Sequence, residues 1–392
     1  MTRKNGPLHG ITVLDLTTYV FGPYATQTLG DLGANVIKIE PPEGDKMRAA
    51  GRKAYSEDLS LNFMSVNRNK RSVALDLKDK TEHAKFLAMI PQAQVLIHNV
   101  RSSAARQLNF DYEKVAALNP SIIYVHCVGY GSGGVYAGRQ AFDDLVQAAS
   151  GTTDLLRRLD GNPEMRTLPT YLADKVSGLH ALYATLAALF HRERTGEGQF
   201  IEVPMLECVT HFTMLEHLYG ATLEPPRGSV GNTLLLSADR AALKTKDGSI
   251  TILPAGKREA ARFLELGGNP GFYKSEAFLN AQDSKTRVEL YHAALRAAAL
   301  TRTTEEWMSL GDESRIAVMR TNTLEDVLND PHLKSVDFFQ LREHPTDGLW
   351  RTMQPPVRFA KTPASIRYEP PHVGEHGPQI EAEMLAARET GQ

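Results

Sequence analysis

The acidic residue whose placement most suggests chemistry is Asp174, which lies near the start of a long apolar stretch with helical spacing. Gly178 follows one helical turn later, where the missing side chain would leave room for a bulky substrate. The spacing fits two interpretations. In one, Asp174 only complements the partial positive charge at a helix N-terminus. In the other, the helix start keeps the pKa of Asp174 low and its carboxylate acts as a nucleophile.

Three other groups of residues carry weaker signals. The basic residues Arg68, Lys70 and Arg71 lead into a predicted strand, and they fit a solvated strand entry better than a phosphate cradle. The glycine-rich run at 131–134 lacks the G-x-S-x-G pattern of a nucleophilic serine and is predicted to be a plain loop. Cys127 lies in an apolar run and is predicted to be inert packing.

Several kinds of cofactor and metal site are disfavoured by the motifs. The loop after the first predicted strand, TTYVFGPYATQTLG, has neither G-x-G-x-x-G nor G-x-x-x-x-G-K-[ST], which disfavours dinucleotide and nucleoside triphosphate chemistry. The 13 histidines are scattered without an H-E-x-x-H motif, and the 2 cysteines match no metal-ligand spacing. We therefore predict no metal site and no tightly bound cofactor.

The charge balance and cysteine content narrow the classes further. The 392 residues include 44 Lys and Arg and 46 Asp and Glu, so a formal charge of −2 provides no basic field for nucleic acid or an anionic membrane. Two cysteines are too few for a disulfide framework and indicate a reducing compartment, so we expect a cytoplasmic protein. The start MTRKNGPLHG has no apolar signal-peptide core, and no apolar run reaches the ~18 residues of a membrane span.

Alternating strands and helices must position these residues in the first two-thirds of the chain. Short apolar runs predict strands at 11–16, 35–40, 72–77, 95–98, 122–128 and 199–203. Helices are predicted at 24–32, 80–90, 171–194 and 207–219. This alternation is typical of an α/β fold with a mostly parallel sheet, which binds ligands at the carboxyl ends of its strands. A site is therefore expected in the loops 17–23, 41–47, 99–103 and 129–140.

The pattern changes after residue 224. A linker rich in Pro and Gly is predicted at 223–232, a hairpin at 241–254 with its turn at 246–248, and mostly helix at 258–309. Strand-like pieces such as 350–353 then return. We therefore predict a large domain that begins at 1–224, a smaller inserted α+β domain at 225–330, and a C-terminal segment at 331–392 that rejoins the large domain.

Motifs along nearly the whole chain carry a resemblance to a known family. They include PLHGI at 7–11, LGANVIKIE at 32–40, NRNKRS at 67–72, Asp174 with Gly178, RTGEGQ at 194–199, and PHVGEH at 371–376. In this order they resemble the family III CoA-transferases of the CaiB/BaiF type, which include formyl-CoA transferase and carnitine CoA-transferase. The resemblance implies a Rossmann-like large domain built from both chain ends and a homodimer of two interlocked rings.

The resemblance also implies a reaction. Asp174 would attack the thioester carbonyl of an acyl-CoA donor, giving an aspartyl anhydride and CoA thiolate. An aspartyl-CoA thioester would then pass CoA to a small carboxylic acid. Neither ATP nor a metal is required, because one thioester is exchanged for another. CoA and acyl-CoA enter as substrates, so the implied partners are acyl-CoA, a small acid and a second copy of the chain.

The contacts to CoA follow from the resemblance by position. They are Tyr19, Val20, Phe21, Leu75, Lys78, Asn99, Val100, Arg101, Arg106, Arg139, Gln140 and Phe142. The chain departs from the family at Gln107, where an arginine is frequent and Arg106 is the neighbour, and at Pro41, which replaces a frequently basic residue. The glycine run that covers the intermediate in formyl-CoA transferases is missing between Gly228 and Gly268, which argues against oxalate or formate as substrates.

Two other functions stay open. The α-methylacyl-CoA racemases share this fold, but they place a histidine just before the aspartate that aligns with Asp143, where this chain has Phe142. Exchange of the substrate's α-proton without an acceptor acid would favour a racemase. A non-catalytic CoA-thioester-binding protein would also share the fold, and it would tolerate Asp174→Asn without loss of function.

Overall fold

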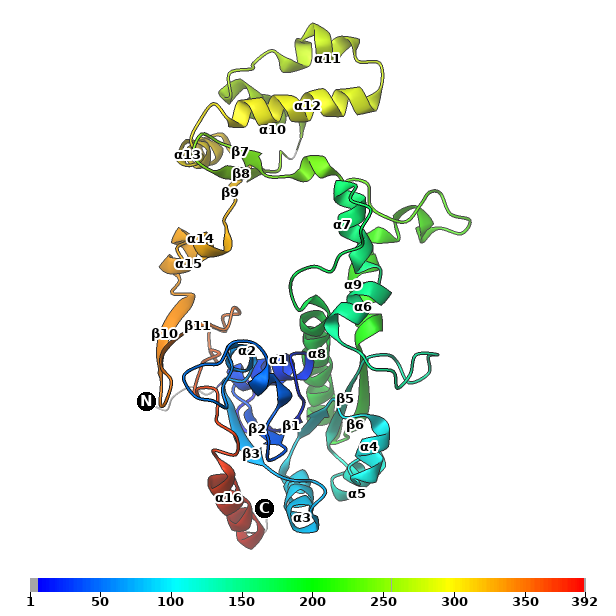
Figure 1. Ribbon diagram of the computed structural model, residues 1–392, viewed down its shortest axis with the longest axis vertical. Helices are drawn as coiled ribbons and strands as arrows, with labels where there is room; N and C mark the ends of the chain where they lie inside the picture. Colours follow the sequence, from blue (N-terminus) through cyan, green and yellow to red (C-terminus); the bar gives the residue numbers. More distant parts are fainter. Residues whose placement is uncertain (1–5, 255, 391–392) are drawn as a thin grey trace. The chain divides into compact units, whose positions relative to one another are not determined.

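The computed structural model describes residues 6–254 and 256–390 and divides the chain into two compact units (Figure 1). The first unit contains the chain up to Asn232 together with the chain from Phe338 onward, and the second is Thr233–Asp337. In the sequence, the second unit thus interrupts the first. The second unit begins and ends several residues later than the insertion predicted at 225–330.

A parallel sheet of six strands forms the centre of the first unit. Its strands are β1 (Thr12–Leu16), β2 (Asn35–Glu40), β3 (Lys70–Ala74), β4 (Val95–His98), β5 (Ile123–Val128) and β6 (Gln199–Pro204). The order is β3-β2-β1-β4-β5-β6, with every neighbouring pair parallel. This is the order of doubly wound folds, and the direction of winding reverses between β1 and β4, where such sheets bind ligands. The predicted α/β class with a parallel sheet is confirmed.

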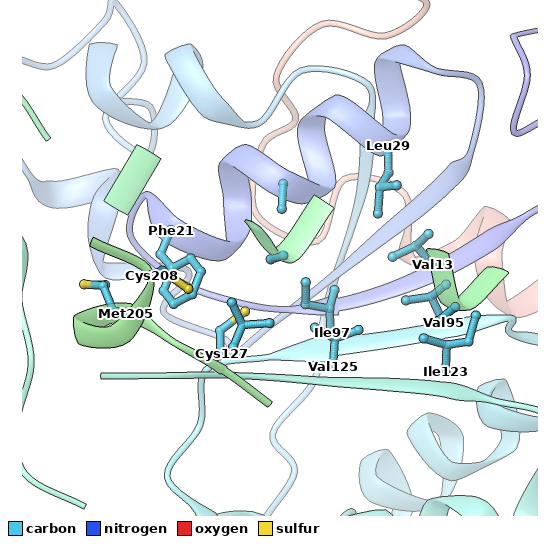
Figure 2. Close-up of a cluster of buried hydrophobic side chains, with 14 of the residues drawn as sticks. Val13, Phe21, Leu29, Val95, Ile97, Ile123, Val125, Cys127, Met205 and Cys208 are labelled. Atoms are coloured by element: carbon cyan, nitrogen blue, oxygen red, sulfur yellow. The ribbon is translucent and has the colours of Figure 1, made fainter. Parts of the chain in front are cut away.

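Both faces of this sheet are covered, which is why its strands read as continuous apolar runs. On one face, α1 (Phe21–Asp31), α8 (Leu172–Thr195) and α9 (Met205–His217) pack against residues such as Val13, Ile97 and Val125 (Figure 2). On the other face lie α3 (Lys80–Met89), α4 (Ser102–Gln107), α5 (Tyr112–Leu118) and the C-terminal α16 (Gly377–Thr390). The chain after the second unit therefore contributes to the core of the first.

Shorter elements complete the first unit. They are η1 (Lys46–Ala49), α2 (Leu61–Val66), η2 (Ile90–Gln92), α6 (Asp143–Ala149), α7 (Thr152–Asp160), η3 (Tyr219–Thr222), and the antiparallel pair β10 (Phe339–His344) and β11 (Gly348–Met353). Within the described ranges, no helix combines the length and apolar character that crossing a membrane requires.

The basic residues before and within β3 are not solvated, as the sequence analysis predicted, but buried. The predicted strand at 72–77 is observed at Lys70–Ala74, and Arg68, Lys70 and Arg71 are buried rather than solvated. Lys70 Nζ lies 2.9 Å from an Asp15 carboxylate oxygen, Arg68 pairs with Asp31 at 2.7 Å, and Arg71 pairs with Glu383 at 2.8 Å. Buried charges require partners, and the three acids that supply them are distant in the sequence.

The second unit is built around a small antiparallel sheet. It contains β7 (Leu243–Lys244), β8 (Ser249–Ile252) and β9 (Val318–Arg320), and β7 with β8 forms the predicted hairpin. The helical elements are η4 (Ala238–Arg240), α10 (Lys257–Leu266), η5 (Phe272–Lys274), α11 (Glu276–Asn280), α12 (Ser284–Ala299), α13 (Thr304–Ser314), α14 (Leu324–Val327) and α15 (Pro331–Ser335). Phe263 stacks on Trp307 in its core, with ring centroids 4.3 Å apart.

Candidate active site

A cavity of about 1310 Å³ lies in the first unit at the carboxyl ends of β1, β4 and β5. Its walls come from the loops that follow these strands, from η1 after β2, and from the segment at 167–174, which leads into α8. The cavity therefore occupies the position where the direction of winding reverses, as expected for a ligand site on such a sheet.

Most of the residues predicted from the sequence meet in this cavity. Its lining includes Asp174, Tyr19, Val20, Phe21, Asn99, Val100, Arg101, Arg106, Arg139, Gln140 and Phe142. Leu75 and Lys78 do not belong to the lining: Leu75 is buried in the core on the α3 side of the sheet. Both follow β3, an edge strand separated from β1 by β2, so the loop after it does not reach the cavity.

Hydrogen bonds from the loop after β4 and from β2 hold the loop after β1 in a strained conformation. Tyr19 has a φ of 68°, a left-handed backbone conformation that residues other than glycine rarely adopt. Asn99 fixes the preceding residue, since its Oδ1 accepts from the Thr18 N–H at 3.1 Å and its Nδ2 donates to the Thr18 carbonyl at 3.0 Å. The buried Lys38–Asp45 pair adds a bond from Lys38 Nζ to the Thr17 carbonyl at 2.9 Å. Such strain persists only where the surroundings over-determine it, as here beside the cavity.

Asp174 lies in the first turn of α8, half-buried at the cavity wall. Burial and then the nearby Asp143 carboxylate raise the pKa of Asp174 to about 7, although a hydrogen bond from the Phe21 backbone opposes the rise. The expectation that the helix start keeps this pKa low is therefore wrong, because desolvation and the like charge outweigh the helix dipole. Phe21 begins α1, so a second helix N-terminus also faces this carboxylate.

Asp143 and Gln147 position the start of α8. Asp143 accepts from the Asp174 N–H at 3.0 Å with one oxygen and from the Gln147 amide at 2.6 Å with the other. The Gln147 side-chain oxygen accepts from the Leu168 N–H at 2.8 Å, which holds the segment before α8. The sequence analysis named Asp143 only in the comparison with racemases and did not name Gln147, because the bonds to the Asp174 and Leu168 N–H groups join residues more than 20 positions apart.

Gly178 serves a different purpose from the one predicted. A Cβ at this position would lie 2.8 Å from the Phe21 carbonyl oxygen and 3.0 Å from the Tyr24 ring. The missing side chain therefore allows α1 and α8 to approach closely, and it does not make room for a substrate. This close approach brings the Phe21 N–H to the Asp174 carboxylate.

Four basic side chains line the cavity and are exposed: Lys46, Arg101, Arg106 and Arg139. The Arg139 guanidinium lies over the Tyr136 ring, 4.7 Å from its centroid. Lys46 was not named from the sequence, although its loop was. The N-cap Asp45, which accepts from the Met47 N–H at 2.9 Å, marks the short helix that carries it. Basic groups of this kind are suited to phosphates.

Two buried residues of β5 complete the cavity floor. Burial lowers the pKa of His126 and raises the pKa of Cys127, so both are neutral at pH 7. His126 Nε2 lies 2.9 Å from the Val100 carbonyl oxygen, which fixes the ring as part of the packing between β4 and β5. The burial and raised pKa of Cys127 agree with its interpretation as a packing residue.

The comparison with known families decides which class of protein carries this cavity. A sequence model of CoA-transferase family III matches residues 8–377. The chain belongs to CoA-transferase family III. It is 34% identical to the acetyl-CoA:oxalate CoA-transferase of Acetobacter aceti over 81% of each chain. It is 31% identical to the succinyl-CoA:glutarate CoA-transferase of Mus musculus over 97% of this chain and 86% of the relative.

The fold agrees with this assignment. A crystal structure of a CaiB/BaiF family protein from Brucella suis superimposes with a TM-score of 0.83 and 28% identity, covering 97% of this chain and 100% of the other. The family III CoA-transferase is therefore an enzyme that moves CoA between an acyl-CoA and a carboxylic acid, as the resemblance in the sequence predicted.

Proposed function

We propose that Asp174 is the nucleophile of this CoA-transferase and carries the exchange through two covalent intermediates. The observation that supports this most strongly is the position of its carboxylate, half-buried in the cavity wall beside the α1 N-terminus. Asp143 and Gln147 fix the backbone around it, so the nucleophile is oriented before the substrate arrives.

The first half of the reaction transfers CoA to the enzyme. An oxygen of Asp174 attacks the thioester carbonyl of the donor, the carbon–sulfur bond breaks, and CoA leaves as a thiolate. The thiolate then attacks the aspartyl carbonyl of the resulting anhydride, and the donor acid departs as a carboxylate. The product is an aspartyl-CoA thioester, and no proton has to be supplied or removed.

The second half reverses these steps with the acceptor. The acceptor carboxylate attacks the aspartyl-CoA carbonyl and releases CoA thiolate. The thiolate attacks the acceptor carbonyl of the new anhydride, which forms the acyl-CoA product and restores Asp174. The backbone N–H of Phe21 is directed at the Asp174 carboxyl group and would stabilise negative charge that develops on its oxygen.

The CoA handle supplies the binding energy that such high-energy anhydrides require. Arg101, Arg106, Arg139 and Lys46 would meet its diphosphate and 3′-phosphate, because guanidinium groups match phosphate oxygens in pairs and the lysine ammonium adds a point charge. The apolar side chains of Val20, Phe21 and Phe142 would lie along the pantetheine arm. The predicted contacts at Leu75 and Lys78 are not part of this proposal, since neither lines the cavity.

The acceptor is proposed to be a small carboxylic acid. Relatives are named for oxalate, glutarate and L-malate, which are all small dicarboxylic acids. The missing glycine run sets oxalate apart, so glutarate, malate and succinate come first in a panel. We also propose the interlocked homodimer, and light scattering of the purified protein would test whether it has the mass of two chains.

The experiment that tests the nucleophile uses hydroxylamine capture. The protein is incubated with a panel of acyl-CoAs, hydroxylamine is added, and modified peptides are mapped by mass spectrometry. The proposal predicts a hydroxamate on the peptide that carries Asp174, and its loss together with transfer in Asp174→Ala. The matched control is Asp144→Ala, which removes another carboxylate from the same cavity lining and should keep both.

The alternative outcomes are distinct. Full transfer by Asp174→Ala would contradict the proposed nucleophile. Exchange of the α-proton of an acyl-CoA in deuterated water, with no acceptor present and no hydroxamate formed, would point instead to a racemase. Binding of CoA without either reaction would indicate a binding protein.

A further inference from the structure

Two segments of the first unit bring together His344, Asp347 and His372 outside the lining of the catalytic cavity. His344 ends β10, Asp347 lies in the turn before β11, and His372 lies in the segment before α16. One ligand atom from each residue lies within 4.8 Å of the others. No catalytic step proposed above uses these residues.

The hydrogen bonds of the two histidines fix where their lone pairs point. His344 Nε2 lies 2.9 Å from the Pro370 carbonyl oxygen, and because a carbonyl only accepts, Nε2 carries the proton. His372 Nδ1 lies 2.8 Å from an Asp58 carboxylate oxygen and is the protonated nitrogen for the same reason. In the neutral rings, His344 Nδ1 and His372 Nε2 are therefore bare acceptors, and both face Thr346.

The acceptors at the centre of this group share the Thr346 hydroxyl, and His344 Nδ1 is reached only by long hydrogen bonds. Thr346 Oγ1 lies 2.7 Å from His372 Nε2 and 3.2 Å from His344 Nδ1, but its one proton can satisfy only one of them. The backbone N–H groups of Thr346 and Asp347 reach His344 Nδ1 only at 3.4 and 3.3 Å. A carboxylate oxygen of Asp347 lies 3.4 Å from the same nitrogen and adds negative charge.

We propose that His344 Nδ1, Asp347 Oδ2 and His372 Nε2 bind a Zn²⁺ ion. Two imidazole nitrogens and a carboxylate form a ligand set that zinc prefers, with a fourth position for the Thr346 hydroxyl or a water molecule. In a tetrahedron with bonds of about 2.0–2.1 Å, ligand atoms are separated by about 3.4 Å. The 3.4 Å between His344 Nδ1 and Asp347 Oδ2 matches this edge, and the ligand atom of His372 lies within 4.8 Å of both, so binding would require the His372 ring to move inward.

The surroundings have the features of a supported metal site. Each histidine is held through its other nitrogen by a carbonyl or a carboxylate, which is the usual way metal-ligating imidazoles are oriented. Ser56 donates to both oxygens of Asp347 at 2.6 and 2.7 Å. His344 and Asp347 are buried, while a quarter of the His372 side chain is exposed and leaves an entry path.

A zinc ion here would have a structural role. It would tie the β10–β11 turn to the segment before α16, and both to the loop that carries Ser56 and Asp58. That loop follows η1, whose Lys46 lines the catalytic cavity. The sequence analysis predicted no metal site because spacing along the chain does not reveal ligands that the fold assembles from separate segments. The proposal does not depend on the role of Asp174.

The test is a zinc titration of the full-length protein after treatment with a chelator and dialysis. We expect one Zn²⁺ bound per chain, a rise in Tm on binding, and with Co²⁺ a visible spectrum typical of tetrahedral nitrogen and oxygen ligands. His372→Gln removes a partly exposed ligand and should weaken zinc binding at least about tenfold. His332→Gln removes an exposed histidine of the second unit and should bind zinc as the unchanged protein does.

Two results would overturn the proposal: no zinc binding by the unchanged protein, or equal affinity in His372→Gln. If His372→Gln fails to fold, Asp58→Asn provides the second test. It keeps all three ligands but loses the carboxylate that orients His372, so zinc affinity should fall by about 10- to 100-fold. Unchanged affinity in Asp58→Asn would then count against the site.

Discussion

The raised pKa of Asp174 makes the first chemical step depend on pH in the neutral range. Only the ionised carboxylate attacks the thioester, and burial with the nearby Asp143 raises the pKa of Asp174 to about 7. A group with this pKa is ionised in about one molecule in ten at pH 6 and about nine in ten at pH 8. The rate of acylation should therefore rise by about tenfold over these two pH units.

An unperturbed aspartate predicts a different curve. With a pKa of about 3.9, the carboxylate would be fully ionised throughout this range and the rate would be flat. The assay is a single-turnover measurement of CoA release at saturating acyl-CoA. Saturation matters because the 3′-phosphate of CoA titrates with a pKa of about 6 and would otherwise affect binding.

Asp143→Asn tests the cause of the shift. It removes the like charge beside Asp174 but keeps an oxygen that can accept from the Asp174 N–H. The midpoint of the pH profile should move to lower pH, whatever the effect on the maximal rate. A flat profile between about pH 6 and pH 8 in the unchanged protein, or an unmoved midpoint in Asp143→Asn, would refute this reasoning.

Three further predictions concern the elements that support the site. Gly178→Ala should destabilise the protein by about 1–3 kcal/mol and impair transfer, because the new Cβ would push α8 away from the Phe21 carbonyl. An unchanged Tm and kcat would contradict the close approach of the two helices. Lys70→Met should cost about 3–5 kcal/mol in urea unfolding, since it leaves the buried Asp15 carboxylate without its cation, and a loss below about 1 kcal/mol would count against that pair. Burial and then neighbouring His126 lower the pKa of His98 well below its usual value, so the unfolded chain binds a proton that the fold excludes. Stability should be complete above about pH 6.5 and fall by up to about 1.4 kcal/mol per pH unit below it, and His98→Leu should flatten that dependence; equal slopes in the two proteins would disprove it.

The sheet and its helices could be predicted because local patterns determine them. The runs that became β2 and β4 were predicted with the observed bounds, since strands buried on both faces are short, apolar and bounded by turns. The shift of β3 had a physical cause. Lys70 and Arg71 look polar in the sequence, but Asp15 and Glu383 make them part of a buried strand.

The candidate site was predicted in composition but not in its electrostatics. Asp174 and the loops after β1, β4 and β5 could be found because the carboxyl ends of parallel strands share one edge. The effects of Asp143 on Asp174 and of Gly178 on Phe21 depend on contacts between separate helices. Pattern along the chain cannot supply these distances, which is why the predicted direction of the Asp174 pKa was wrong.

Oxygen exchange at Asp174 tests the central claim most directly. In the proposed reaction, the bridging oxygen of the second anhydride comes from the acceptor acid and stays on Asp174 when the thiolate attacks the acceptor carbonyl. A single turnover with an acceptor labelled with oxygen-18 should therefore place one labelled atom in the peptide that carries Asp174, and repeated turnover should place up to two, as measured by mass spectrometry. An unlabelled Asp174 peptide after complete turnover would contradict covalent catalysis by this residue.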